Sequence, residues 1–107
     1  MMLLTKANRK VLPLLYGQEN KGGDAVAYVK FFTPDSNWTW YASEFDPEEE
    51  RFFGLVDGHE KEFGYFMLSE LQTATGPLGL HIERDMHFTQ KTLREIAPEL
   101  FTEETDG

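Results

Sequence analysis

The sequence contains no cysteine among its 107 residues. This absence excludes disulfide bonds, thiolate nucleophiles and metal centres bound through cysteine, and it agrees with a reducing compartment. No run of about 18 apolar residues is present, so no segment is long enough to span a bilayer as a helix. The first leucines are followed by charges and by Pro13, which leaves no signal-peptide core. We therefore expect a soluble cytoplasmic protein without membrane contact.

Basic residues are scarce: ten Lys and Arg stand against 19 Asp and Glu, which gives a formal net charge of -9. A negative surface repels phosphates, so nucleic acid is an unfavourable partner. The composition is 40% hydrophobic and 14% aromatic, which suffices for a packed core. A chain of this length forms one domain. We expect a single domain over residues 1–107, with residues 1–7 and 102–107 frayed.

Turn residues divide the middle of the chain into segments rich in aromatic and β-branched side chains, which are typical of strands. Four such segments are expected to be strands: 25–32, 38–45, 51–56 and 62–68. Pro34 favours a turn after the first of them, and Asp57-Gly58 predicts a two-residue hairpin with positive φ angles. A further edge strand is predicted within 78–88. This order predicts an antiparallel meander.

Helix signals lie outside these strands. Capping-box patterns at Ser69 and Thr92 predict two short helices, and a third is expected from Thr5 to Leu12. The fold class is therefore α+β, with a twisted antiparallel meander of four to five strands and two or three short helices. Because the strands carry apolar side chains on both faces, we expect the sheet to be barrel-like or to keep one face as a binding surface.

Four segments follow one another at a characteristic spacing: FFTPDSNWTWYASEFD, FFGLVDG, EFGYFMLSEL and GPLGLHIERDMHF. Together they resemble the bacterial family catalogued as domain of unknown function 2958, and the resemblance covers residues 8–96. It implies a small protein of a mobile genetic element, such as a plasmid, conjugative element or phage. The family has no assigned catalytic residues, so the resemblance implies no reaction.

A candidate interaction surface combines aromatic rings with acids in one stretch of the chain. Its members are Trp38, Trp40, Tyr41, Glu44, Asp46, Glu48, Glu49 and Glu50. Rings rimmed by carboxylates suit a basic protein partner, encoded by the host or the element. A specific form is anti-restriction by DNA mimicry, in which the acids imitate phosphates. The leading hypothesis is thus a non-catalytic protein-interaction module without a cofactor.

Strand alternation leaves open whether the two tryptophans belong to the core or to the surface. In residues 38–45 it sends alternate side chains to opposite faces. One face receives Trp38, Trp40 and Ala42, and the other receives Thr39, Tyr41, Ser43 and Phe45. We expect the rings to be mostly core, with the interaction at the acidic turn that follows.

Two alternatives come from other classes of function. On an extended strand, two imidazoles and two carboxylates share a face and could bind zinc or manganese for a metal-assisted hydrolase or nuclease. These residues are His81, Glu83, Asp85 and His87. Polar residues on an edge strand give the same pattern, so we expect no metal and no enzyme. Sheet aromatics could also stack single-stranded nucleic acid, but only Lys30 and Arg51 lie among them.

Overall fold

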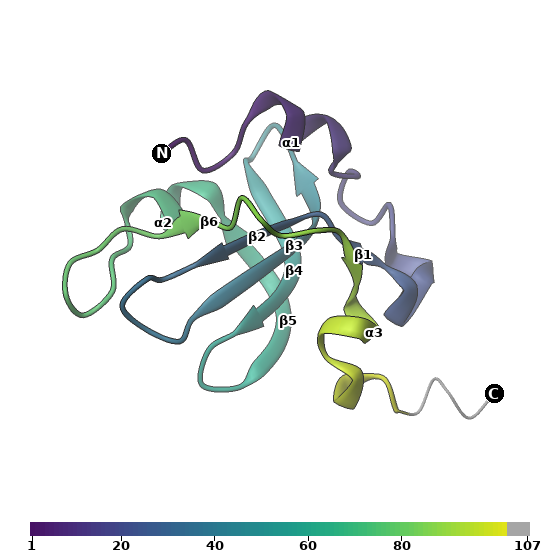
Figure 1. The fold of residues 1–107 in the computed structure, drawn as a ribbon. Coiled ribbons are helices and arrows are strands. Elements are labelled where there is room, and N and C mark those ends of the chain that lie inside the picture. Colours follow the sequence, from purple (N-terminus) through teal and green to yellow (C-terminus); the bar gives the residue numbers. More distant parts are fainter. Residues whose placement is uncertain (103–107) are drawn as a thin grey trace.

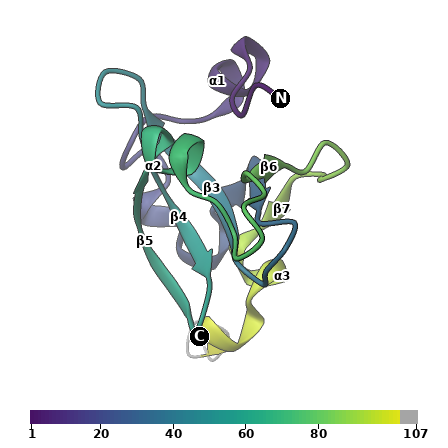
Figure 2. The same cartoon turned by 90° about the vertical axis from the view of Figure 1, so that its left-hand side faces the viewer.

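The computed structural model describes residues 1–102, and its main element is a curved antiparallel sheet of five strands (Figure 1). The strands are β2 (Val29–Phe32), β3 (Thr39–Asp46), β4 (Arg51–Asp57), β5 (Lys61–Met67) and β6 (Glu83–Arg84). Their order is β5-β4-β3-β2-β6, so the predicted meander is confirmed, and the edge strand is the short β6. Within residues 1–102 the outer strands β5 and β6 do not pair, so the sheet is not a closed barrel (Figure 2).

Short helices and a second small sheet complete the fold. The helices are α1 (Lys6–Val11), α2 (Leu68–Thr73), α3 (Leu93–Ile96) and the 3-10 helices η1 (Glu19–Asp24) and η2 (Pro98–Leu100). The second sheet pairs β1 (Val26–Ala27) with β7 (Lys91–Thr92), a pairing that the sequence pattern did not predict. No helix in this described part of the chain has the length and apolar character needed to cross a membrane.

Two of the three expected helix starts are confirmed. Thr5 caps α1 and Thr92 caps α3, because each hydroxyl accepts a hydrogen bond of 3.1 Å from the third backbone N–H of its helix. The third helix, α2, begins one residue before Ser69, so Ser69 lies inside the helix and is not its cap. There the Glu70 carboxylate accepts from the Met67 N–H at 2.8 Å, which satisfies a donor left free at the helix start.

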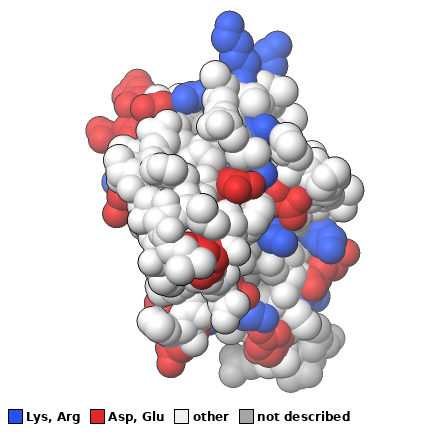
Figure 3. Space-filling view, turned by 60° about the vertical axis from the view of Figure 1, so that its left-hand side comes forward, with Lys and Arg blue, Asp and Glu red and all other residues white. Residues whose placement is uncertain are grey.

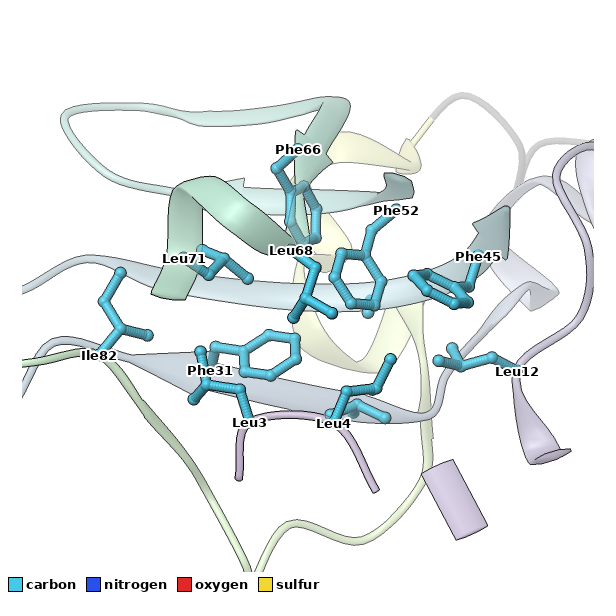
Figure 4. Close-up of a cluster of buried hydrophobic side chains, with 12 residues drawn as sticks. Leu3, Leu4, Leu12, Phe31, Phe45, Phe52, Phe66, Leu68, Leu71 and Ile82 are labelled. Atoms are coloured by element: carbon cyan, nitrogen blue, oxygen red, sulfur yellow. The ribbon is translucent and has the colours of Figure 1, made fainter. Parts of the chain in front are cut away.

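The main hydrophobic core lies on one face of the sheet (Figure 4). Each of the strands β2 to β5 contributes one phenylalanine ring: Phe31, Phe45, Phe52 and Phe66. The ring centroid of Phe52 lies 5.5, 4.7 and 5.2 Å from those of the other three in strand order. Leu68 and Leu71 of α2 cover the same cluster. Burying one such ring contributes about 1.5 to 3 kcal/mol, so this cluster is the principal apolar stabilisation of the fold.

The first residues of the chain complete this core. Leu3 and Leu4 are buried against it, and the Arg84 guanidinium donates to the Leu3 carbonyl oxygen at 3.0 Å. Within residues 1–7, which we expect to be frayed, Leu3 and Leu4 are thus packed against the core, where burial of their side chains offsets the entropy lost by the backbone. The other end expected to fray, 102–107, lies outside the described residues except for its first residue.

An extra residue at Ser43 changes the alternation of β3. Ala42 and Glu44 pair with consecutive residues of β4, so Ser43 forms a β-bulge. Before the bulge the expected alternation holds, and Trp40 packs on the main core. After the bulge the phase is reversed. The sequence pattern predicts that Phe45 lies on the face opposite Trp40, but the reversed phase places it in the main core. Glu44 lies on the opposite side.

The connection between β4 and β5 differs from the predicted two-residue turn. The strands end at Asp57 and resume at Lys61, and the φ angle of Gly58 is not positive. Gly58 is required for a different reason, since a Cβ there would lie 2.5 Å from the ring of Trp38. The prediction of a two-residue turn with positive φ angles is therefore wrong, and the glycine instead accommodates the close approach of a tryptophan ring.

Two glycines that face each other across β4 and β5 give a matched test of the packing. A Cβ on Gly54 would lie 1.9 Å from the carbonyl oxygen of Tyr41, whereas a Cβ on Gly64 would meet nothing within 4 Å. Gly54→Ala should therefore lower the free energy of unfolding by about 1 to 3 kcal/mol, the usual cost of overpacking. Gly64→Ala should leave it unchanged or raise it. Equal denaturation midpoints for the two variants would contradict the close approach of β3 to β4.

Candidate functional site

A hollow of about 350 Å³ lies on the face of the sheet opposite the main core. There η1 and α3 cover the sheet only in part, and Phe101, directly after η2, lines one side. Five aromatic rings line this hollow, which we call the aromatic groove: Tyr16, Phe53, Phe63, Tyr65 and Phe101. Its polar lining consists of Gln18, Glu19, Ser43 and Glu44.

Three of these rings are largely exposed. Tyr16 keeps 60% of its surface accessible, Phe63 keeps 40% and Tyr65 keeps 51%. Single exposed apolar residues are ordinary on a protein surface, but several around one concavity mark an interaction site. The sequence pattern missed this groove, because its rings come from β4, β5 and two segments without strand or helix signals.

A buried carboxylate lies at the wall of the groove. Glu44 is 4% exposed, and its two oxygens accept from the backbone N–H groups of Tyr16 at 2.7 Å and Gln18 at 2.9 Å. Within residues 1–102 it forms no ion pair. Hydrogen bonds from backbone N–H groups stabilise its charge. Glu44 thus holds the segment before η1 against the bulge, and its negative charge is not neutralised by a cation.

The side chain of Gln18 fixes the same segment from inside. Gln18 is 3% exposed, and its amide nitrogen donates to the carbonyl oxygens of Val26 at 2.9 Å and Ser43 at 2.8 Å. It also lies 2.9 Å from the Ser43 hydroxyl, while the amide oxygen accepts from the Val26 N–H at 2.8 Å. This side chain therefore joins the bulge of β3 to β1 and satisfies the backbone groups of both.

Tyr16 is strained at its backbone and held at both ends. Its φ angle of 70° lies in the left-handed region, which non-glycine residues seldom occupy. Its N–H donates to Glu44, and its hydroxyl accepts from the Tyr65 hydroxyl at 3.2 Å. The pKa of Tyr65 is raised, mainly by this hydrogen bond and secondly by desolvation. Strained residues of this kind concentrate at functional sites.

The predicted acidic surface is divided by the fold. Glu44 belongs to the aromatic groove, whereas the other four acids lie at the β3–β4 turn. There Asp46 accepts from the backbone N–H groups of Glu48 at 3.0 Å and Glu49 at 3.4 Å, and Glu50 forms an ion pair of 2.8 Å with Arg9. Of the acids at this turn, only Glu48 and Glu49 have carboxylates that form no hydrogen bond or ion pair within residues 1–102. Two free carboxylates do not reproduce the regular charge row of a DNA strand.

Of the three aromatic residues of the predicted surface, Tyr41 is separated from the two neighbouring tryptophans. Trp40 is half-buried against the main core, and Tyr41 lies on the opposite face, 6.0 Å from the ring of Phe88. Trp38 is exposed, with its ring 6.0 Å from Trp40 and 5.4 Å from His59. The structure therefore provides no stacking row for single-stranded bases at these residues.

The four candidate metal ligands are not brought together. β6 contains only Glu83 and Arg84, and the chain turns at Asp85, whose carboxylate accepts from the His87 N–H at 2.9 Å and pairs with Lys30. Glu83, Asp85 and His87 do not form a cluster with the exposed His81. No group of three or more His, Asp or Glu in residues 1–102 could hold a metal ion. The metal hydrolase alternative thus lacks the geometry that its strand pattern required.

Figure 3 shows one face of the domain with a broad area of uncharged surface, a group of acids at the corner where the β3–β4 turn lies, and further acids scattered over the middle, the right and the lower edge. Loops at the opposite end of β3 from this turn expose three apolar side chains, Trp38, Leu78 and Leu80, which we call the uncharged patch. Asp35 connects the two loops, because its carboxylate accepts from the Leu78 N–H at 2.7 Å. Asp35 therefore has a structural role, because it holds a loop that is distant in sequence against its own turn.

The family model for a protein of unknown function, DUF2958, matches residues 3–97. The chain belongs to this family, as the resemblance indicated. No curated protein and no solved structure matches the chain. The matched range contains Glu44, Gln18 and every ring of the aromatic groove except Phe101.

The buried amide gives a test of how the groove is built. Gln18→Ala leaves the backbone groups of Val26 and Ser43 without partners, so the free energy of unfolding should fall by about 1 to 3 kcal/mol. Gln72→Ala, at an exposed position of α2, should change it by less than about 0.5 kcal/mol. Chemical denaturation measures both. Equal stability of the two variants would contradict the anchoring role of Gln18.

Proposed function

We propose that the chain is a non-catalytic protein-interaction module and that a protein partner docks in the aromatic groove. The observation that carries this proposal is the exposure of Tyr16, Phe63 and Tyr65 around one hollow. Aromatic rings in concave surfaces supply much of the binding energy of protein interfaces, since each buries a large area at a small cost in conformational entropy. The apolar area of these rings contributes about 25 cal/mol per Å² when a partner removes it from water.

The polar chemistry of the groove favours binding over catalysis. Both oxygens of Glu44 already accept backbone hydrogen bonds, and the Ser43 hydroxyl lies 2.9 Å from the Gln18 amide. A nucleophile requires a neighbouring base, and the lining residues of the groove include no histidine to activate this hydroxyl. These groups act as a fixed wall rather than as a proton relay.

The class of partner follows from the charge of the groove. In the described part of the chain its lining contains Glu19 and Glu44 and no Lys or Arg, which disfavours nucleic acid. A protein partner meets no such repulsion. The family resemblance adds the setting of a mobile genetic element in the cytoplasm, in which the partner is a host or element-encoded protein.

Capture from a bacterial lysate with matched variants tests the proposal. Tyr65→Ser removes an exposed ring of the groove, and Leu78→Ser removes an exposed side chain of the uncharged patch. We expect the wild type and Leu78→Ser to retain the same protein, and Tyr65→Ser to retain it about tenfold less, as for loss of about 1.4 kcal/mol at an interface. Mass spectrometry quantifies the retained proteins. Loss of the protein with Leu78→Ser alone would place the site at the uncharged patch instead.

A further inference from the structure

The aromatic groove combines two features that select for one kind of ligand. Its walls are aromatic, and within residues 1–102 its charged lining residues are Glu19 and Glu44 alone. Aromatic faces carry negative electrostatic potential, so rings and carboxylates together create a negative, largely apolar hollow. An anion is repelled by such a site, and a neutral apolar group leaves the carboxylates without a counter-charge. A cation on an aliphatic stem satisfies both features.

The rings at the edge of the groove already bind cationic groups of this chain. The Arg51 guanidinium lies 5.3 Å from the ring centroid of Tyr65, and that of Arg94 lies 6.0 Å from the ring centroid of Phe101. Both distances are within the range of cation–π contacts. Neither arginine lines the groove, so its interior keeps the two carboxylates as its charged groups.

We propose that the groove binds one lysine or arginine side chain of the protein partner, with the aliphatic stem between the rings and the cationic head near Glu44. This inference rests on the proposed function and names the chemistry that the groove selects. Glu44 is suited to the role because its charge is already desolvated and fixed by two backbone N–H groups. A ligand therefore meets a preorganised charge, and no side chain has to be ordered when it binds.

Two backbone amides report directly on the site. The N–H groups of Tyr16 and Gln18 donate to Glu44, so a cation that approaches this carboxylate should alter both hydrogen bonds. Two-dimensional ¹H–¹⁵N NMR of the full chain follows them during titration with a short capped peptide that contains one lysine between glycine and alanine residues. The indole N–H of Trp38 serves as the internal control, because Trp38 does not line the groove.

Matched peptides separate the charge from the stem. Norleucine keeps the aliphatic chain and removes the ammonium group, and it should bind about tenfold more weakly than lysine, since a desolvated charge contact is lost. A glutamate peptide should not shift either amide. An arginine peptide should bind comparably to the lysine peptide, and added salt should weaken both.

Glu44→Gln removes the negative charge at the wall of the groove and should weaken binding of the lysine peptide about tenfold. A ring variant keeps the test valid if this protein fails to fold. Tyr65→Leu retains an apolar side chain and removes the aromatic face, so it should weaken the lysine peptide about two- to fivefold and leave the norleucine peptide nearly unchanged. Equal affinity for lysine and norleucine peptides would overturn the inference, while the capture assay would still support an apolar docking groove. Absence of any shift at Tyr16 and Gln18 with the lysine peptide overturns it as well, and the capture assay then decides separately on the proposed function.

Discussion

The hydrogen bonds between the Gln18 side chain and the bulge at Ser43 are the constraint on which the rest of the structure depends. A bulge in the middle of a long strand leaves backbone groups without ladder partners, and a buried amide satisfies them here. The bulge reverses the phase of β3, so that Phe45 completes the main core and Glu44 reaches the aromatic groove. Core and groove are therefore consequences of the same extra residue.

A sheet with apolar side chains on both faces requires cover on both, and this chain has only short elements to supply it. The main core is covered by α2, residues before α1 and the segment that enters β6. The second face receives η1, the small β1–β7 sheet and α3, which bury Ala27 and Leu93 but leave Phe63 and Tyr65 exposed. The aromatic groove lies where this cover ends. The strained backbone of Tyr16 occurs at the same place, where its N–H is hydrogen-bonded to Glu44 of β3.

Local signals allowed much of the fold to be predicted, whereas the site depends on distant contacts. The meander and the caps at Thr5 and Thr92 follow from residues close in sequence, which determine turns and helix starts. Burial of Leu3, pairing of β1 with β7 and the bulge at Ser43 require partners far along the chain, and strand alternation carries no sign of them. Glu44 was selected from the sequence as one of a row of acids. Its actual environment became evident only when Gln18, 26 residues earlier, was placed beside it.

The acids of residues 44–50 show how position decides what a carboxylate can do. Asp46 uses its oxygens to hold a turn, and Glu50 is paired with Arg9 in an exposed contact of the kind that contributes little to stability or binding. Glu44 accepts two backbone N–H groups at once, one on each oxygen, whereas a glutamine would offer only one oxygen to the two donors. The structural requirement for two acceptors thus places a full negative charge at the wall of a hollow lined by rings. A carboxylate that the fold requires in this way also contributes, beside Glu19, to the negative charge of the aromatic groove.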